Sequence, residues 1–154
     1  MEASEIIKTF CERTGIGYEP DADGSCAFEA DGLPVTISNL RELDAIALVG
    51  DLGEPPPERL EALYRMMLEA NHLFGGTGGA TISLDSEKGR FSLCRTLPCK
   101  AIDADSFYDV AERFVSTLEV WTKLIRDFRE APPAEGETSA AISGGIAPGG
   151  FIAV

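Results

Sequence analysis

The part of this chain that most restricts its possible folds is residues 68–85, with the sequence LEANHLFGGTGGATISLD. Apolar residues before the glycines recur with the spacing of an amphipathic helix, whereas Ala80, Ile82 and Leu84 alternate with polar residues as in a strand. Glycine readily adopts the left-handed backbone conformations that end helices. The segment therefore predicts a helix that stops at the glycines and is followed at once by a strand.

The same glycines also suggest another interpretation, a loop that binds phosphate through its backbone N–H groups. Phosphate-binding loops lie between a strand and a following helix, so that the positive N-terminal end of the helix faces the anion. Here the loop follows the C-terminal end of a helix, and no Gly-Lys-Ser or Gly-Lys-Thr comes after it. We therefore interpret the glycine cluster as structural.

The remaining elements follow from periodicity and turn signals. We expect helices at about 4–14, 58–74 and 105–129, and strands at about 26–30, 33–38, 45–52, 80–84 and 91–97. Asp31 and Gly32 fit a two-residue hairpin turn between the first two strands. The order α-β-β-β-α-β-β-α, rich in hairpins, predicts an α+β fold with a mixed, largely antiparallel sheet packed with helices.

The chain of 154 residues is long enough for one domain with a hydrophobic core. We expect that single domain to span residues 1–130. Residues 131–154 are dominated by alanine, glycine and proline, which predicts a flexible tail.

The helix expected at 58–74 is apolar around most of its circumference. A helix that lies on one sheet needs an apolar arc only a little wider than ~100°. The excess apolar surface predicts a homodimer, with the same residues facing their own copies across a twofold axis. The predicted interface residues are Leu60, Leu63, Tyr64, Met66, Met67 and Ala70.

No arrangement of residues points to catalysis or to a metal. His72 is the single histidine, and it lies beside Glu69 on the polar stripe of its helix, where exposure is expected. The four cysteines lack the close pairing of zinc sites, although Cys94 and Cys99 leave a regulatory disulfide open. We therefore expect a protein that is not an enzyme and needs neither cofactor nor metal.

The net charge of −13 narrows the possible partners. An acidic surface repels nucleic acids and anionic membranes and favours a basic or amphipathic polypeptide. The first residues lack the pattern of a signal peptide, and no apolar run approaches the ~18 residues of a membrane span. We expect a cytoplasmic protein without nucleic-acid or membrane partners.

Residues 68–85, together with the sequence FVSTLEVW at 114–121, resemble the Tir chaperone (CesT) family of type III secretion chaperones. The resemblance extends over roughly residues 1–130 in the order of the elements. It implies a cytoplasmic homodimer joined mainly through its second helix. It further implies that the protein binds an N-terminal segment of a secreted effector and keeps the effector soluble and competent for secretion, without ATP.

The effector surface is expected on the first helix and the edge of the first hairpin, where apolar residues would contact an extended segment. The predicted contact residues are Ile6, Ile7, Phe10, Leu33, Val35 and Ile37. An alternative hypothesis keeps the same fold but not the secretion role. In it, the protein is a stand-alone regulatory or sensory domain that binds a resident partner.

Overall fold

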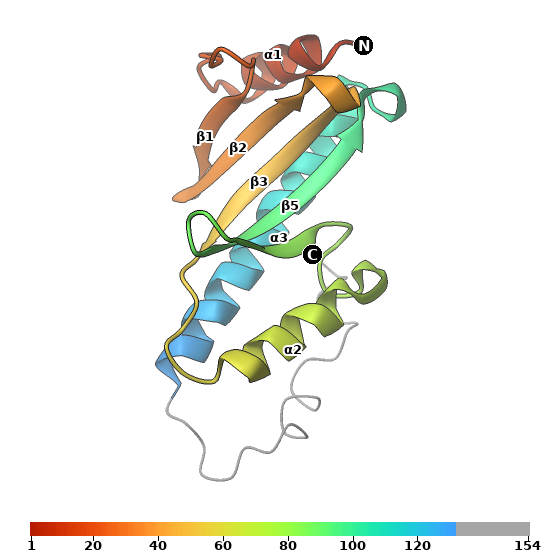
Figure 1. Ribbon diagram of the computed structural model, residues 1–154. Helices are drawn as coiled ribbons and strands as arrows, with labels where there is room; N and C mark the ends of the chain where they lie inside the picture. The colour runs from red at the N-terminus through yellow and green to blue at the C-terminus, as the bar shows by residue number, and fades with distance from the viewer. Residues whose placement is uncertain (132–154) are drawn as a thin grey trace.

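The computed structural model describes residues 1–131 and shows one five-stranded sheet with three α-helices (Figure 1). The elements are α1 Ala3–Thr14, β1 Cys26–Ala30, β2 Leu33–Leu40, η1 Arg41–Leu43, β3 Ala45–Gly53, α2 Leu60–Asn71, η2 His72–Phe74, β4 Thr81–Asp85, β5 Arg90–Pro98, η3 Cys99–Ala101 and α3 Ala104–Glu130, where η marks a short 3-10 helix. The predicted fold class and element order are thereby confirmed. The tail predicted for residues 131–154 lies, apart from Ala131, outside the described residues.

The strands are arranged in the order β1-β2-β3-β5-β4, and every neighbouring pair is antiparallel. Because β3 pairs with β5, the chain places β4 on the outside, beyond β5. The two edges of the sheet are therefore β1 and β4. Both are short, with five residues each.

Helices α1 and α3 cover one face of the sheet (Figure 1). Side chains that share this face by register, such as Ile37, Leu48 and Leu93, are completely buried. The closest approach is at Gly50 in β3, where an added Cβ would lie 2.5 Å from Cδ1 of Leu118 in α3. Glycine at this position therefore lets α3 lie directly on the middle of the sheet.

The junction between α2 and β4 differs from its prediction in one respect. Helix α2 ends at Asn71, and Leu73 and Phe74 then adopt left-handed conformations with φ of 50° and 58° before the glycines are reached. Gly76 serves close packing instead, since an added Cβ would lie 2.7 Å from the Cβ of Ala70. Non-glycine residues thus break the helix, and the glycines provide the close approach and the turn that follow.

Two side chains fix this junction to the rest of the molecule. The indole N–H of Trp121, in α3, donates to the carbonyl of Gly76 at 2.8 Å. The amide of Asn71 bonds the backbone of Ile82 twice, accepting from its N–H at 2.9 Å and donating to its carbonyl at 3.1 Å. Asn71 therefore satisfies backbone groups at the outer edge of β4 that a neighbouring strand would otherwise engage.

An ion pair at the bulge of β3 predicts a pH effect on stability. Burial raises the pKa of Asp51, but the hydrogen bond and the charge of Arg90, with the Gly53 N–H, outweigh burial and hold that pKa below its ordinary value of 3.8. A depressed carboxyl pKa stabilises the fold above pH 3.8, and the stabilisation is lost as the pH falls through the folded-state pKa. We expect Asp51→Asn to lower Tm at pH 7 and to differ less from the wild type at pH 2.5.

Thermal unfolding followed by circular dichroism at both pH values measures this difference. Asparagine retains an oxygen that can accept the Gly53 N–H, so the substitution removes mainly the charge. Glu87→Gln, in the exposed turn between β4 and β5, is the control and should leave Tm unchanged. An equal Tm deficit for Asp51→Asn at both pH values would contradict the role of the ion pair.

Candidate functional site

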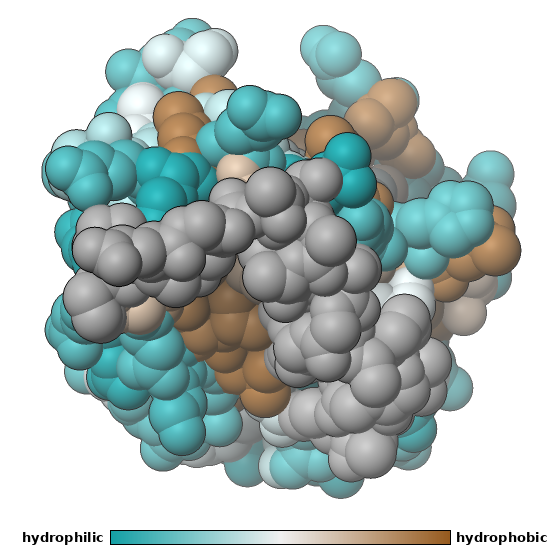
Figure 2. Space-filling model, turned by 90° about the horizontal axis from the view of Figure 1, so that it is seen from below, coloured by the Kyte–Doolittle hydropathy of each residue, from teal (hydrophilic) through white to brown (hydrophobic). Residues whose placement is uncertain are grey.

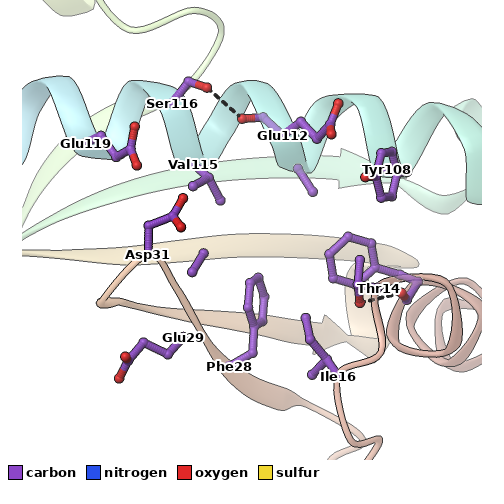
Figure 3. Close-up of a pocket in the computed structure, with 13 residues that line it drawn as sticks. Thr14, Ile16, Phe28, Glu29, Asp31, Tyr108, Glu112, Val115, Ser116 and Glu119 are labelled. Carbon is purple, nitrogen blue, oxygen red and sulfur yellow. Dashed lines mark hydrogen bonds between the residues drawn. The ribbon is translucent and has the colours of Figure 1, made fainter.

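A groove of about 650 Å³ lies between the C-terminal end of α1, strand β1 and the middle of α3 (Figure 3). Its lining is formed by Phe10, Thr14, Ile16, Phe28, Glu29, Ala30, Asp31, Tyr108, Ala111, Glu112, Val115, Ser116 and Glu119. Three segments that are distant in the sequence thus contribute to one surface.

Aromatic side chains form the floor of the groove. The Phe10 ring packs 5.7 Å from Phe28 and 6.1 Å from Tyr108, and it meets the buried Phe107 edge-on at 5.3 Å. Phe28 and Tyr108 remain half-buried because no further element covers them in the described structure. Val115 extends this apolar surface along α3 (Figure 3).

Carboxylates surround the floor. Glu112 and Glu119 come from α3 and Asp31 from the turn of the first hairpin, while the Glu29 side chain of β1 points away from the groove (Figure 3). The Glu112 carboxylate, through a hydrogen bond and its charge, raises the pKa of the Tyr108 hydroxyl. The groove therefore combines an apolar floor with an acidic rim.

Strand β1 gives the groove a second property, because it is a sheet edge whose single strand neighbour within residues 1–131 is β2. Phe28 and Ala30 of β1 point to the groove side of the sheet, opposite Val35 and Leu33 of β2. An extended segment pairing with β1 would place every second side chain over the groove. The other edge, β4, is already bonded by Asn71.

A family model for the Tir chaperone protein (CesT) family matches residues 5–122, which is most of the chain. The chain belongs to this family. Its match includes all three sides of the groove and the α2–β4 junction. A search of curated proteins finds no match.

Solved structures agree with the CesT fold. The chain is similar to a chain of the ExsC–ExsE complex, with 17% identity and a TM-score of 0.67 over 79% of this chain and 92% of that chain. It is similar to a chain of the HopA1–SchA chaperone–effector complex, with 20% identity and a TM-score of 0.60 over 84% and 97%. It is also similar to a chain of the complex of the Yersinia pestis type III secretion chaperone SycH with a YscM2 fragment, with 17% identity and a TM-score of 0.60 over 77% and 98%.

The effector-contact residues predicted for this CesT chain lie on the expected elements, but most of them face inward. Ile6, Ile7, Val35 and Ile37 are buried in the core, because α1 and the hairpin pack these side chains under α3. Phe10 lines the groove, and Leu33 is half-buried beside it. Their role in effector contact stays a prediction. Most of the side chains that a partner could reach in the groove are different residues.

Four of those reachable side chains were not selected from the sequence: Ile16, Phe28, Tyr108 and Val115. Phe28 belongs to the alternating pattern of the first hairpin, so periodicity could have indicated which face of the sheet it occupies. Tyr108 and Val115 lie at the border of the apolar stripe of α3, and only the position of α1 beside α3 brings them to the groove.

The predicted dimer residues are divided between the inside and the outside of the CesT fold. Leu63, Met66 and Met67 are buried, and Leu60, Tyr64 and Ala70 are half-buried. Large apolar side chains are nevertheless exposed nearby, with exposed fractions of 68% for Leu68, 85% for Leu73, 52% for Phe74 and 50% for Leu84. Figure 2 shows several hydrophobic regions on the face seen from below, the side on which α2 lies in Figure 1.

Within residues 1–131, no cluster of side chains indicates a metal site. His72 is exposed, and these residues include no group of three histidine, cysteine or acidic side chains that could hold a metal. None of the helices in this part of the chain is both long and apolar enough to cross a bilayer. Cys94 and Cys99, for which a disulfide was left open, are both free thiols.

The cysteines give a prediction about reactivity. Burial, the neighbouring charge of Cys26 and a hydrogen bond with it raise the pKa of Cys11 to about 11, and burial chiefly raises the pKa of Cys99. The thiolate is the reactive form, so both thiols should react slowly at neutral pH. We expect Cys94, which is only half-buried, to be alkylated first by iodoacetamide, as measured by peptide mass spectrometry over time. Urea-unfolded protein is the control, in which all four rates should converge; fastest labelling of Cys11 in the native protein would contradict the prediction.

Proposed function

We propose that this protein is a cytoplasmic secretion chaperone that binds an N-terminal segment of a type III secreted effector and keeps the effector soluble and competent for export. The groove beside the free edge of β1 is the observation that carries the proposal. Membership of the CesT family and the likeness to chains from chaperone complexes support it.

The proposed binding mode joins main-chain and side-chain recognition. Pairing with β1 supplies backbone hydrogen bonds that tolerate many sequences, while the aromatic floor selects apolar side chains at alternate positions. A segment held in this way stays extended, and its apolar side chains are withheld from aggregation. Binding free energy alone maintains that state, so the proposed mechanism needs no ATP and no catalytic residue.

We further propose that the chaperone acts as a homodimer through α2, η2 and β4. Leu68, Leu73, Phe74 and Leu84 of these three elements are exposed, and Leu60 and Tyr64 of α2 are half-buried. A twofold axis at this surface would bury all of these side chains at once. The groove lies on the opposite edge of the sheet, so dimerisation would leave it accessible.

Affinity purification from the native cytosol tests the effector role. The bound protein is identified by mass spectrometry, and limited proteolysis of the complex defines the protected segment. We expect a secreted protein protected near its N-terminus, together with slower amide hydrogen exchange in β1. A folded, resident cytosolic protein as the partner would instead favour the regulatory hypothesis.

Two valines of α3 provide a matched pair for this purification. Val115 lines the groove, whereas Val120 is also half-buried but does not line it. We expect Val115→Asp to lose the bound protein and Val120→Asp to retain it. Equal retention by both variants would place the effector surface elsewhere.

A further inference from the structure

We propose that the groove selects a basic segment: an extended chain in which apolar residues that face the groove alternate with, or are flanked by, lysine or arginine. This inference rests on the proposed function, and it adds the chemical character of the partner.

The charged side chains that line the groove all carry negative charge. Among the described residues that line it, Asp31, Glu112 and Glu119 are acidic and none is lysine, arginine or histidine, and a fourth acidic residue, Glu29, lines it but points its side chain to the other face of the sheet. The nearby Arg13 lies 4.1 Å from the centre of the Tyr108 ring, but its guanidinium is paired with Asp105 at 2.7 Å. An acidic segment would meet uncompensated repulsion here, whereas a basic one meets a complementary field.

Carboxylates lie on both faces of a strand added to β1, Glu29 on the face away from the groove and Glu112 and Glu119 on the groove side. Glu29 lies between Phe28 and Ala30, so its side chain points to the face of the sheet opposite the groove, as Figure 3 shows. A residue of the added strand beside Glu29 would share that face, where an opposite charge on neighbouring strands is stabilising. A lysine or arginine is therefore favoured at that position, directly between two side chains that enter the groove.

Helix α3 supplies carboxylates on the groove side. Glu112 and Glu119 are seven residues apart, which is two helical turns or about 10 Å along the helix axis. About three to four residues of an extended strand span the same length. Long basic side chains entering the groove can lay their methylene groups on the apolar floor and place their charges at these carboxylates. The two sides together favour a segment with basic residues both between and around its apolar pair.

Synthetic peptides test the charge preference without knowledge of the effector. Three capped peptides share the same alternating valine and leucine positions and carry lysine, serine or glutamate at the positions between them. Binding to the full chain is measured by fluorescence anisotropy at low and at physiological salt. We expect the lysine peptide to bind at least ~10-fold more tightly than the serine peptide, with a steep loss at higher salt, and the glutamate peptide not to bind.

Variants of the chain distinguish the effect of the carboxylates at the groove and on β1 from the effect of the overall negative charge. The triple variant Glu29→Gln, Glu112→Gln, Glu119→Gln should weaken binding of the lysine peptide by roughly 3- to 30-fold and bring it near the serine peptide. The matched control Glu5→Gln, Glu42→Gln, Glu87→Gln removes the same charge from exposed positions outside the groove and should change binding less than about twofold.

Each outcome decides the inference. Equal binding of the lysine and serine peptides, equal effects of the two triple variants, or binding of none of the peptides would overturn it. Val115→Asp distinguishes these results from a failure of the proposed function. If that variant still loses its native bound protein, the groove remains the binding site and only the basic preference is wrong; if it retains the protein, the groove itself is not the site.

Discussion

Replacing two exposed leucines by glutamate should convert the proposed dimer into a folded monomer. Leu68 and Leu73 have 68% and 85% of their surface exposed, so neither supports the core of its own chain. In a twofold interface the double variant introduces four charges into an apolar contact, because each substitution occurs in both copies. We expect the dissociation constant to rise by at least roughly 100-fold, since central apolar residues of interfaces each contribute about 1–2 kcal/mol or more.

Light scattering coupled to size-exclusion chromatography at micromolar concentrations measures this change. Leu43→Glu is the matched control, because Leu43 is also strongly exposed but belongs to η1, at the end of the sheet far from α2 (Figure 1). The control should remain dimeric, and circular dichroism should show native helix content in all three proteins. A monomeric wild type, or a control that dissociates equally, would refute the proposed interface.

The second large effect is expected where α3 lies on the sheet. Gly50→Ala places a methyl group within 2.5 Å of the Leu118 side chain, and we expect this overpacking to cost about 1–3 kcal/mol of unfolding free energy. Leu118→Ala alone should cost about 2–5 kcal/mol, because it leaves a cavity in the core. Combined, the two substitutions should cost clearly less than the sum, since the alanine methyl at position 50 occupies part of that cavity.

Urea unfolding gives the four free energies of this double-mutant cycle. Trp121 is the single tryptophan and is buried in α3 near the contact, so its fluorescence reports the transition. Gly17→Ala with Leu118→Ala is the control cycle, because Gly17 has no positive φ and nothing beyond its chain neighbours lies within 4 Å of a Cβ added there. Strict additivity for Gly50 and Leu118 would show that the contact does not limit the approach of α3.

Much of the fold was predictable because periodicity and turn signals act within each element. The first hairpin formed around Asp31 and Gly32 as expected, and the three helices occur in the expected places. The end of α2 was placed three residues late, because the left-handed conformation was assigned to glycine and is adopted by Leu73 and Phe74. Propensity alone does not reveal the contacts that Asn71 and Gly76, on either side of this break, make with Ile82 and Ala70.

The candidate site was predictable only in part. The sequence indicated α1 and the first hairpin as the elements that present a binding surface, and Phe10 does line the groove. The more strongly apolar residues of the same elements, such as Ile7 and Ile37, are in the core instead. Hydrophobicity ranks residues for burial, so it identifies the core before it identifies a half-exposed binding surface.

Local spacing and composition were enough to predict the type and order of the elements and the acidic surface, and the motif at residues 68–85 was enough to indicate the family. Packing in three dimensions was needed to show that β4 lies outside β5, that β1 is an open edge within residues 1–131, and that Phe10, Phe28, Tyr108 and Val115 share one groove. Periodicity shows which residues share a face of one element. Which faces meet depends instead on packing between elements far apart in the chain, here on how closely α3 approaches Gly50 and on where α1 lies beside it.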